Sequence, residues 1–277
     1  MNEKSEKPTG LADLLALCRR GEKFAMLTCY DATSARWLQD AGLRVLLVGD
    51  TAAEMILGFD RTIHAPLDFM IQITAAVKRG APQCFVMADM PFMSYQADEA
   101  EAVRNAGRFM TEGRADAVKL EVGPGDLALV GKLSAAGIPV VAHLGSRPQQ
   151  AARSGGYRAA GKTADEARAL VRLAEGMVEA GAVMLLLEAT AGEVAGAVTG
   201  QVDVPVIGCG AGPACDGQVI VLHDLLGLSR WQPPFAQPHV RLGEHMVAAV
   251  RQWIESVHQS TGADPYRMDR LERDKFA

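Results

Sequence analysis

The sequence predicts a (β/α)8 barrel, which is a closed parallel sheet surrounded by helices, and two observations support this prediction. A unit made of a helix-like stretch, a glycine, a short apolar strand and a polar residue recurs along the 277 residues. The strands of this unit are continuously apolar, as parallel strands covered by helices tend to be. Eight such units in about 250 residues match the usual size of this barrel.

The expected elements follow one another in a regular order. GLADLLALCRRGEK (10–23) is expected to form an extra N-terminal helix that closes the bottom of the barrel. Eight strands are expected in FAMLTCYD (24–31), LQDAGLRVLLVGD (38–50), VKRGAPQCFVMADM (77–90), MTEGRADAVKLEVG (110–123), LSAAGIPVVAHLG (133–145), MVEAGAVMLLLEAT (177–190), VTGQVDVPVIGCG (198–210) and QVIVLHDLLG (218–227). In the units between them, each helix is expected to end on a glycine in the left-handed conformation. These glycines are Gly42, Gly80, Gly113, Gly137, Gly181 and Gly200.

The chain is expected to form one domain over residues 1–277, with 1–10 and about 259–277 as tails. The polar C-terminal segment is interpreted either as a free tail or as a contact between subunits. A doubly wound open sheet is the alternative fold. It fits less well, because polar residues end nearly every strand and do not gather at one switch point.

The composition excludes several classes of protein. The formal net charge is −5 and there is no block of Lys and Arg, which argues against nucleic-acid binding. The five cysteines form no C-x-x-C pair, which argues against a disulfide framework and a zinc site. The N-terminus lacks the apolar core of a signal peptide, and no apolar run approaches the roughly 20 residues that cross a bilayer. We therefore expect a cytoplasmic protein with no membrane contact.

The segment DAVKLEVG (116–123) carries the most informative charges, because Lys119 and Glu121 interrupt an apolar strand. Alternate residues of a strand point to the same face. Lys119 and Glu121 should therefore project together, while the intervening apolar side chains pack on the other face. Taken alone, this pair is also compatible with a structural ion pair.

Ionisable residues end five successive strands, and in a (β/α)8 barrel these ends form the active site. The residues are Asp50, Asp89, Lys119, Glu121, His143 and Glu188. Any one of them has a structural interpretation, such as a helix N-cap for an Asp or a hydrogen-bonded core residue for a His. Several carboxylates at this end of the barrel, its mouth, repel one another unless a cation shares the site. Oxygen ligands of this kind suit Mg²⁺.

The glycine-rich segment GCGAGPACDGQ (208–218) is similar to a phosphate-binding loop, and such loops do follow the seventh strand of some barrels. The lysine of a Walker loop and the acidic partner of a dinucleotide-binding motif are both absent. Its glycines are equally compatible with a tight turn beside the site.

Nearly the whole chain resembles the ketopantoate hydroxymethyltransferase family. The matching segments are MLTCYDATSA, VLLVGD, AVKRGAP, ADMPFMSYQ, RADAVKLEVG, AGIPVVAHLG, SGGYRAAGKT and, most distinctively, GAGPACDGQVIVLHDLLGL. The resemblance implies a barrel of the phosphoenolpyruvate/isocitrate-lyase type, usually assembled as a decamer. It also implies transfer of a hydroxymethyl group from 5,10-methylenetetrahydrofolate to 3-methyl-2-oxobutanoate, giving 2-dehydropantoate for pantothenate synthesis.

The resemblance also implies roles for individual residues. Asp50, Asp89 and Glu121 match the magnesium-site residues of the family. Thr51, Asp89 and Lys119 match positions that contact the 2-oxo acid, and Asp50 and His143 are expected beside them. Glu188 matches the proton acceptor. This set fits a mechanism in which Mg²⁺ and Lys119 stabilise an enolate while Glu188 removes the proton from the neighbouring carbon.

The chain departs from the family pattern in loops on the catalytic face. The departures are Thr51, Glu54, Ser146–Arg147, Ala189–Gly192 and Cys209. A change of substrate would be encoded in such loops. The alternatives are therefore a paralogue that uses the same metal-enolate chemistry on another 2-oxo acid, either as a transferase or as an aldolase, and a non-catalytic scaffold. Retention of the ionisable residues together argues against the scaffold.

Overall fold

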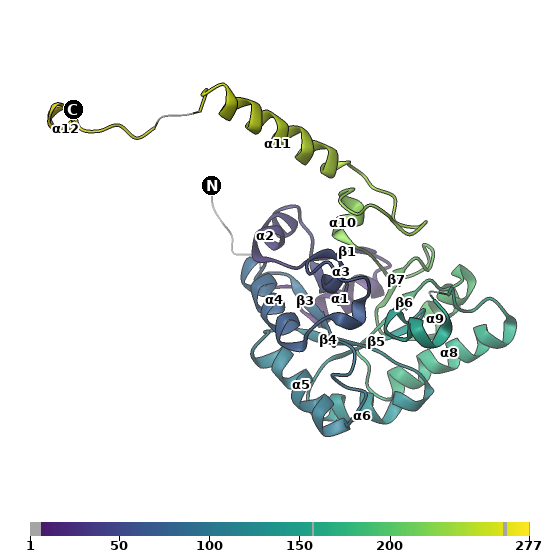
Figure 1. The fold of residues 1–277 in the computed structure, drawn as a ribbon. Coiled ribbons are helices and arrows are strands. Elements are labelled where there is room, and N and C mark those ends of the chain that lie inside the picture. Colours follow the sequence, from purple (N-terminus) through teal and green to yellow (C-terminus); the bar gives the residue numbers. More distant parts are fainter. Residues whose placement is uncertain (1–6, 157, 263–264, 277) are drawn as a thin grey trace.

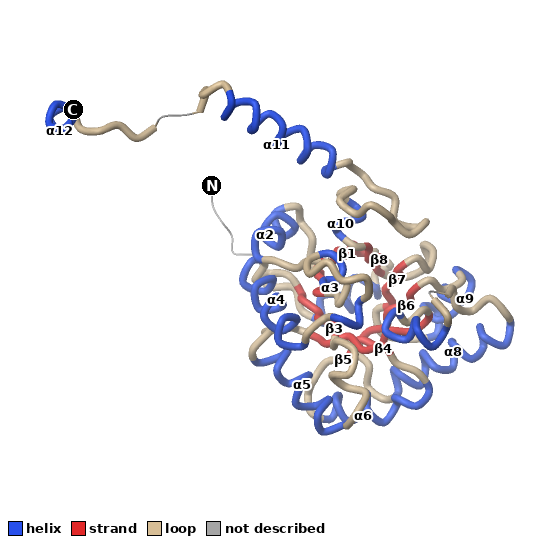
Figure 2. Tube along the Cα trace, viewed as in Figure 1, coloured by secondary structure: helices blue, strands red, loops and turns tan. Residues whose placement is uncertain are grey.

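A computed structural model describes residues 7–156, 158–262 and 265–276, and its centre is a closed barrel of eight parallel strands (Figures 1 and 2). Neighbouring strands pair in sequence order, and β8 pairs with β1 to close the sheet. The strands are β1 Phe24–Thr28, β2 Val45–Val48, β3 Phe85–Asp89, β4 Ala117–Glu121, β5 Val140–Gly145, β6 Met184–Glu188, β7 Val206–Cys209 and β8 Gly217–Ile220. The expected (β/α)8 barrel and its eight strands are confirmed.

Helices surround this barrel and connect its strands, except β7 and β8, which are joined by a loop (Figure 1). The α-helices are α1 Leu11–Arg19, α2 Ala32–Asp40, α3 Ala52–Met55, α4 Leu67–Gly80, α5 Glu99–Thr111, α6 Leu127–Ala135, α7 Ala151–Ser154, α8 Ala164–Glu179, α9 Gly192–Gln201, α10 Leu222–Leu225, α11 Leu242–His258 and α12 Arg270–Phe276. Three 3-10 helices are η1 Thr62–His64, η2 Pro124–Asp126 and η3 Pro148–Gln150. Of the expected tails, residues 1–6, 263–264 and 277 lie outside the described residues. The assignment of residues 1–277 to one domain stays a prediction.

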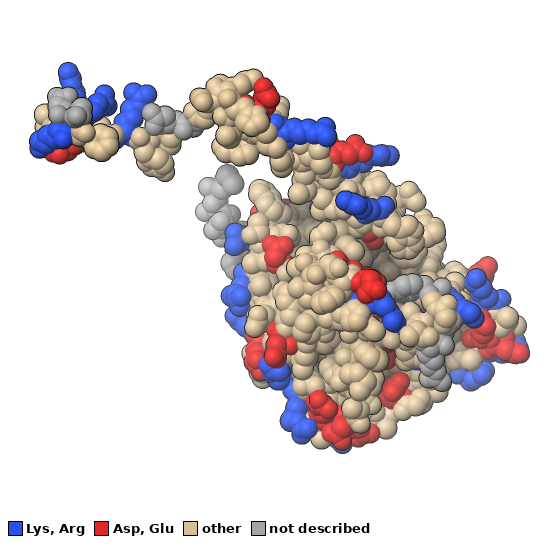
Figure 3. All heavy atoms as spheres, in the orientation of Figure 1, with Lys and Arg blue, Asp and Glu red and all other residues tan. Residues whose placement is uncertain are grey.

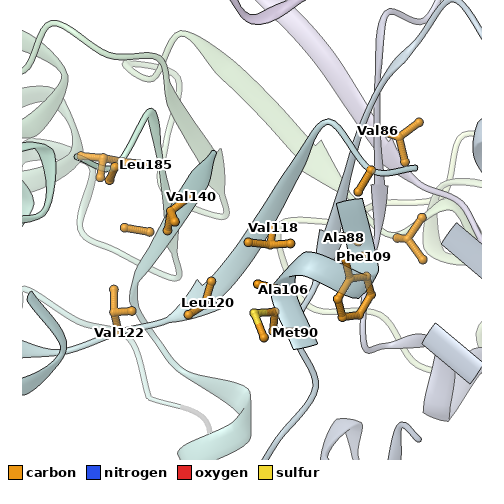
Figure 4. Close-up of a cluster of buried hydrophobic side chains, with 14 of the residues drawn as sticks. Val86, Ala88, Met90, Ala106, Phe109, Val118, Leu120, Val122, Val140 and Leu185 are labelled. Atoms are coloured by element: carbon orange, nitrogen blue, oxygen red, sulfur yellow. The ribbon is translucent and has the colours of Figure 1, made fainter. Parts of the chain in front are cut away.

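Two apolar layers hold the barrel together. Val118, Leu120 and Val122 lie in the outer layer, between the sheet and helices such as α5, which contributes Phe109 (Figure 4). The inner layer fills the barrel with side chains from all eight strands, including Phe24 and Met184. Leu14 and Leu17 of α1 belong to this inner layer, so α1 closes the end of the barrel where β1 begins. This is the extra N-terminal helix that the sequence predicts.

The prediction that a left-handed glycine ends each helix is correct at three of the six positions. Gly42, Gly137 and Gly181 have φ between 79° and 105°, as expected for a left-handed turn after a helix. Gly80, Gly113 and Gly200 do not adopt a positive φ. Gly80 is needed for close packing and not for a turn, because an added Cβ would lie 2.3 Å from the carbonyl oxygen of Ala32.

Helix α11 extends away from the barrel in Figures 1 and 2, and none of its residues is buried. In the view of Figure 3, Lys and Arg alternate with Asp and Glu over the barrel and form no large patch of one sign. Within the described residues, no helix is both long enough and apolar enough to span a membrane.

Candidate active site

The six ionisable residues singled out in the sequence meet at the carboxyl ends of the strands. Asp89 ends β3, Lys119 and Glu121 lie in β4, His143 lies in β5 and Glu188 ends β6. Asp50 follows β2 by two residues. Five of the six are buried, and the side chain of Glu188 is 21% exposed.

The strand alternation explains why these polar groups point inward. Ala117 of β4 belongs to the inner apolar layer, so Lys119 and Glu121, two and four residues later, face the barrel axis. The register pairs Asp89 with Lys119 and Glu121 with His143 on neighbouring strands. The prediction that Lys119 and Glu121 project together is confirmed.

A continuous chain of contacts runs across the mouth from β3 to β6. Lys119 Nζ lies 3.0 Å from Asp89 Oδ1 and 3.2 Å from His143 Nδ1. On the far side of the imidazole, His143 Nε2 lies 3.4 Å from Glu188 Oε2. The order Asp89, Lys119, His143, Glu188 therefore places an ammonium and an imidazole between two carboxylates.

The loop after β2 brings Asp50 against Asp89. The backbone N–H of Asp50 donates to Asp89 Oδ2 at 3.0 Å. An added Cβ on Gly49 would lie 2.8 Å from Thr51 Oγ1, so a larger residue here would require the Thr51 side chain to move. The glycine before Asp50 therefore leaves room for the Thr51 hydroxyl beside the site.

Burial and mutual repulsion disfavour the ionised carboxyls. Burial and the charge of Asp89 raise the pKa of Asp50 from 3.8 to about 7. Burial and the charge of Asp50 raise the pKa of Glu121 from 4.5 to about 9, although Lys119 opposes this shift. Both shifts indicate a site with more negative charge than its own residues neutralise.

Lys119 carries the compensating charge within the protein. Burial alone would lower its pKa, but the surrounding carboxylates outweigh burial and raise the pKa above its ordinary value. Lys119 is therefore an ammonium group, which can only donate hydrogen bonds.

The charge of Lys119 determines the tautomer of His143. Burial and the neighbouring ammonium lower the pKa of His143, so its ring is neutral. Because Lys119 Nζ donates to Nδ1, the ring proton must be on Nε2, which faces Glu188. At 3.4 Å this contact is long, and Nε2 makes no hydrogen bond of good geometry with the described residues.

The strand that carries Glu188 ends in a strained turn. Ala189 has a φ of 44°, a left-handed conformation that costs a non-glycine residue about 1 kcal/mol. Two hydrogen bonds hold it, from the Ala189 N–H to Cys209 O at 2.8 Å and from the Ala160 N–H to Ala189 O at 2.9 Å. Cys209 pairs with Glu188 in the register, and burial and the charge of Glu188 keep its thiol protonated by raising its pKa.

The other departures from the family pattern differ in their distance from this cluster. Thr51 lies beside it, with its hydroxyl 2.7 Å from the hydroxyl of the buried Tyr30. Glu54 lies apart from it: burial and the charges of Asp224 and Asp60 raise its pKa, so its neighbours are acidic residues outside the cluster.

Arg147 and the start of the glycine-rich loop lie at the rim, while residues 213–215 of this loop reach Lys23 at the amino end of β1. An added Cβ on Gly123, which follows β4, would lie 2.7 Å from Arg147 Nη1, so the guanidinium covers this glycine. In the 208–218 loop, Gly210 has a φ of 66°, and the ring of Phe235 packs where its Cβ would be. The glycines of this loop therefore serve a tight turn and close packing.

Two residues of the site were missed by the sequence reasoning, Tyr95 and Gln149. Gln149 Nε2 donates to Asp50 Oδ2 at 2.9 Å, and its backbone N–H donates to both carboxylate oxygens of Glu121 at 3.2 and 3.1 Å. The Tyr95 hydroxyl lies 2.9 Å from Gln149 Oε1. The only signal was their place in the loops that follow β3 and β5, in the matching segment ADMPFMSYQ and in HLGSRPQ.

The carboxylate oxygens of the site provide part of the shell that a divalent cation needs. Among the described residues, no three His, Cys, Asp or Glu side chains form a complete metal cage. However, Asp89 Oδ1 is buried and makes no hydrogen bond of good geometry, although Lys119 Nζ is 3.0 Å away. Together with the raised pKa of Asp50, this oxygen, which lacks a hydrogen bond of good geometry, fits Mg²⁺, which takes few protein ligands and completes its shell with water and substrate oxygens.

Comparisons with known proteins identify the family that this chain resembles. The model of the ketopantoate hydroxymethyltransferase family matches residues 9–262. The 3-methyl-2-oxobutanoate hydroxymethyltransferase of Hyperthermus butylicus is 46% identical over 252 residues, which cover 91% of this chain and 87% of that protein. The protein of the same name from Moorella thermoacetica is 43% identical, with 92% and 95% covered.

Solved structures of more distant proteins share the barrel. A 2,3-dimethylmalate lyase, described as a member of the PEP mutase/isocitrate lyase superfamily, is similar with a TM-score of 0.57 and 18% identity, covering 94% of this chain and 92% of that one. A phosphonopyruvate hydrolase in complex with oxalate and Mg²⁺ is similar with a TM-score of 0.59 and 13% identity, covering 96% and 94%. These likenesses concern the fold.

Proposed function

The chain belongs to the ketopantoate hydroxymethyltransferase family, and on that premise we propose that it transfers a hydroxymethyl group from 5,10-methylenetetrahydrofolate to 3-methyl-2-oxobutanoate, giving 2-dehydropantoate. The family membership makes it a one-carbon transferase of the hydroxymethyltransferase class. The observation that carries the proposal is the contact chain from Asp89 through Lys119 and His143 to Glu188, with Asp50 at one end.

Asp50 and Asp89 are proposed to hold Mg²⁺, with Glu121 acting directly or through water. Both oxygens of Glu121 already accept the Gln149 N–H, which favours the contact through water. When bound, the ion would polarise the keto oxygen of the substrate and stabilise negative charge there. The phosphonopyruvate hydrolase structure supports this, since it holds Mg²⁺ with oxalate, whose adjacent oxygens resemble those of a 2-oxo acid.

Lys119 and Thr51 are proposed to orient the 2-oxo acid. The Lys119 ammonium is held between Asp89 and His143, so it offers a fixed positive charge to the keto oxygen without moving. The Thr51 hydroxyl is held by Tyr30 and lies next to Asp50 in the chain, where it can meet the substrate carboxylate. His143 and Asp50 complete the proposed set of substrate-binding residues.

Glu188 is proposed to act as the base. It takes the proton from C3, and the electron pair of that C–H bond moves into the C2–C3 bond while negative charge moves to the keto oxygen. The Nε2–H of His143 faces the Glu188 carboxylate at 3.4 Å, so a small movement would bring the two into a hydrogen bond. Water adds to the methylene carbon, both bonds from that carbon to the two folate nitrogens break, and the two hydrogens of the water go to these nitrogens, so the carbon is released at the oxidation level of formaldehyde. C3 then bonds to this carbon, and its oxygen takes the proton held by Glu188 to become the hydroxyl group.

The proposal is tested by separating proton abstraction from one-carbon transfer. The purified protein is incubated with 3-methyl-2-oxobutanoate in deuterated buffer without folate, and loss of the C3 hydrogen is followed by proton NMR. In a second assay, folate-dependent formation of 2-dehydropantoate is measured. We expect both reactions with this substrate. Exchange of a different 2-oxo acid in preference to this one would favour the paralogue, and the absence of both reactions with every 2-oxo acid would refute the proposal.

We also propose that the protein is a cytoplasmic homo-oligomer, a decamer according to the family resemblance. Helix α11 supports the assembly. Its large apolar side chains recur at helical spacing and are exposed, with Trp253 64% and Val250 55% accessible. An uncovered apolar stripe of this length is unfavourable in water, and a second copy of the chain would cover it.

A further inference from the structure

Gln149 is buried at the centre of the mouth, although it lies in a short 3-10 helix after β5. Its residue is 5% exposed, and its side chain reaches Asp50, 99 positions earlier in the chain. None of the roles discussed above belongs to it. A buried glutamine must satisfy two N–H donors and a carbonyl acceptor, so its contacts define what it does.

The side-chain amide of Gln149 is satisfied on both sides. Nε2 donates to Asp50 Oδ2 at 2.9 Å and to Met90 O at 3.1 Å. Oε1 accepts from the Tyr95 hydroxyl at 2.9 Å and from Gln96 Nε2 at 3.1 Å. A flipped amide would place Oε1 against a carboxylate and a carbonyl, so only one orientation is possible.

The backbone of the same residue holds a second carboxylate. The Gln149 N–H points between the two oxygens of Glu121, at 3.2 and 3.1 Å. Tyr95 strengthens this arrangement, because its hydroxyl accepts the backbone N–H of Glu121 at 3.1 Å. The hydroxyl donates its single hydrogen to Gln149 Oε1 at 2.9 Å, which is nearer than the alternative acceptor, Glu121 O at 3.2 Å. Gln149 therefore joins carboxylates from the β2 and β4 ends of the barrel.

We propose that Gln149 is a positioning residue for the cation site: it fixes Asp50 through Oδ2 and Glu121 through both oxygens, and so sets the affinity for a divalent cation. Among the described residues, no hydrogen bond reaches Asp50 Oδ1, which leaves this oxygen for the ion. The inference rests on the proposed function for the identity of the ion. Groups that orient metal ligands typically change metal affinity about 10-fold to 100-fold when they are removed.

The test uses Mn²⁺ as the probe and needs no turnover. Binding of Mn²⁺ to the full chain is titrated by the loss of the free-ion signal in electron paramagnetic resonance, with no substrate present. In Gln149→Met the volume of the side chain is kept and the four hydrogen bonds of the side-chain amide are lost, while the backbone N–H that holds Glu121 remains. We expect the Mn²⁺ dissociation constant to rise by about 10-fold or more. The Mg²⁺ concentration for half-maximal activity should rise in parallel, while kcat at saturating Mg²⁺ falls much less.

A matched control is Gln39→Met, which removes another glutamine amide. The side chain of Gln39 lies near the amino ends of the strands, where its Oε1 accepts the Gln83 N–H at 2.9 Å. This variant should bind Mn²⁺ as the wild type does, even if its melting temperature falls. A loss of stability without a loss of Mn²⁺ affinity in Gln149→Met would show a merely structural role and overturn the inference.

Tyr95→Phe keeps the test decisive if Gln149→Met does not fold. It removes the hydroxyl that holds Gln149 Oε1 and the Glu121 N–H, so Mn²⁺ should bind more weakly than in the wild type. Wild-type affinity in a folded Tyr95→Phe protein would overturn the inference. If the wild type did not bind Mn²⁺, the inference and the metal assignment would both fall. If Mn²⁺ affinity dropped as expected but no 2-oxo acid exchanged its hydrogen, only the proposed function would fail.

Discussion

Replacement of Lys119 by methionine tests whether its positive charge balances the carboxylates at the carboxyl ends of the strands. The change keeps most of the aliphatic stem and removes a buried ammonium that lies 3.0 Å from Asp89 Oδ1 and 3.2 Å from His143 Nδ1. Asp50, Asp89 and Glu121 would then share the mouth without a neighbouring positive charge. The variant should therefore lose both stability and transition-state stabilisation.

The structure gives a magnitude for each loss. Removing one partner of a buried ion pair typically costs about 3–5 kcal/mol, because the other charge stays buried. Removing a donor that faces developing negative charge costs about 2–4 kcal/mol, which is about a 30-fold to 1,000-fold loss in kcat/KM.

The loss of stability should depend on pH. The pKa of Asp50 is raised in the folded protein to about 7 from 3.8, so its contribution to stability is present below pH 3.8 and is lost as the pH rises through 7. In Lys119→Met more carboxylates are neutral at pH 6 than at pH 8. The difference from the wild type should therefore be smaller at pH 6.

The assay combines urea unfolding in a chelator at pH 6 and pH 8 with steady-state kinetics at saturating Mg²⁺. Lys132→Met is the matched control, because Lys132 forms an exposed ion pair with Glu99 at 2.9 Å, a kind of pair that contributes about 0–1 kcal/mol. An unchanged kcat/KM for Lys119→Met would refute the role of Lys119 toward the substrate. If the variant lost the same free energy of unfolding relative to the wild type at pH 6 and at pH 8, the argument from the carboxyl pKa values would be refuted.

Three further predictions concern other parts of the proposal. Glu188→Gln should bind 3-methyl-2-oxobutanoate with near-normal affinity but fail to exchange its C3 hydrogen with deuterated solvent; exchange at the wild-type rate would place the base elsewhere. Asp89→Asn, which is nearly isosteric, should stay folded and lose most activity, whereas full activity in this variant or in a chelator would contradict the metal assignment. Val250→Asp in α11 should reduce the molar mass measured by light scattering, while an unchanged mass would show that this face takes no part in assembly.

The strands could be predicted because two local signals agree at each of them. A continuous apolar run such as Val45–Val48 marks a parallel strand, and a polar residue after it marks the functional end of the barrel. The period of two in β4 then placed Lys119 and Glu121 inside. Both kinds of signal depend only on neighbours in the sequence, so one sequence is enough to read them.

The supporting residues could not be predicted, because their function depends on contacts between distant segments. Gln149 has no local pattern, and its meaning comes from Asp50, 99 residues away. Gly80 was expected to turn the chain, yet it is required by the close approach of Ala32 in a neighbouring helix. Such constraints become visible only when the helices and strands are packed.

The departures from the family pattern leave the contact chain from Asp89 to Glu188 intact. Thr51 lies beside it, Arg147 lies at the rim, and Cys209 lies beside Glu188 as a protonated thiol. If proton abstraction depends on this contact chain and substrate choice on the residues around it, as proposed, the two can change independently. If these departures have altered the substrate, another 2-oxo acid should exchange its C3 hydrogen faster than 3-methyl-2-oxobutanoate, and Glu188→Gln should abolish exchange of both. Exchange that survives in this variant for one acid only would show that the two acids use different bases, and the separation of chemistry from selectivity would be wrong.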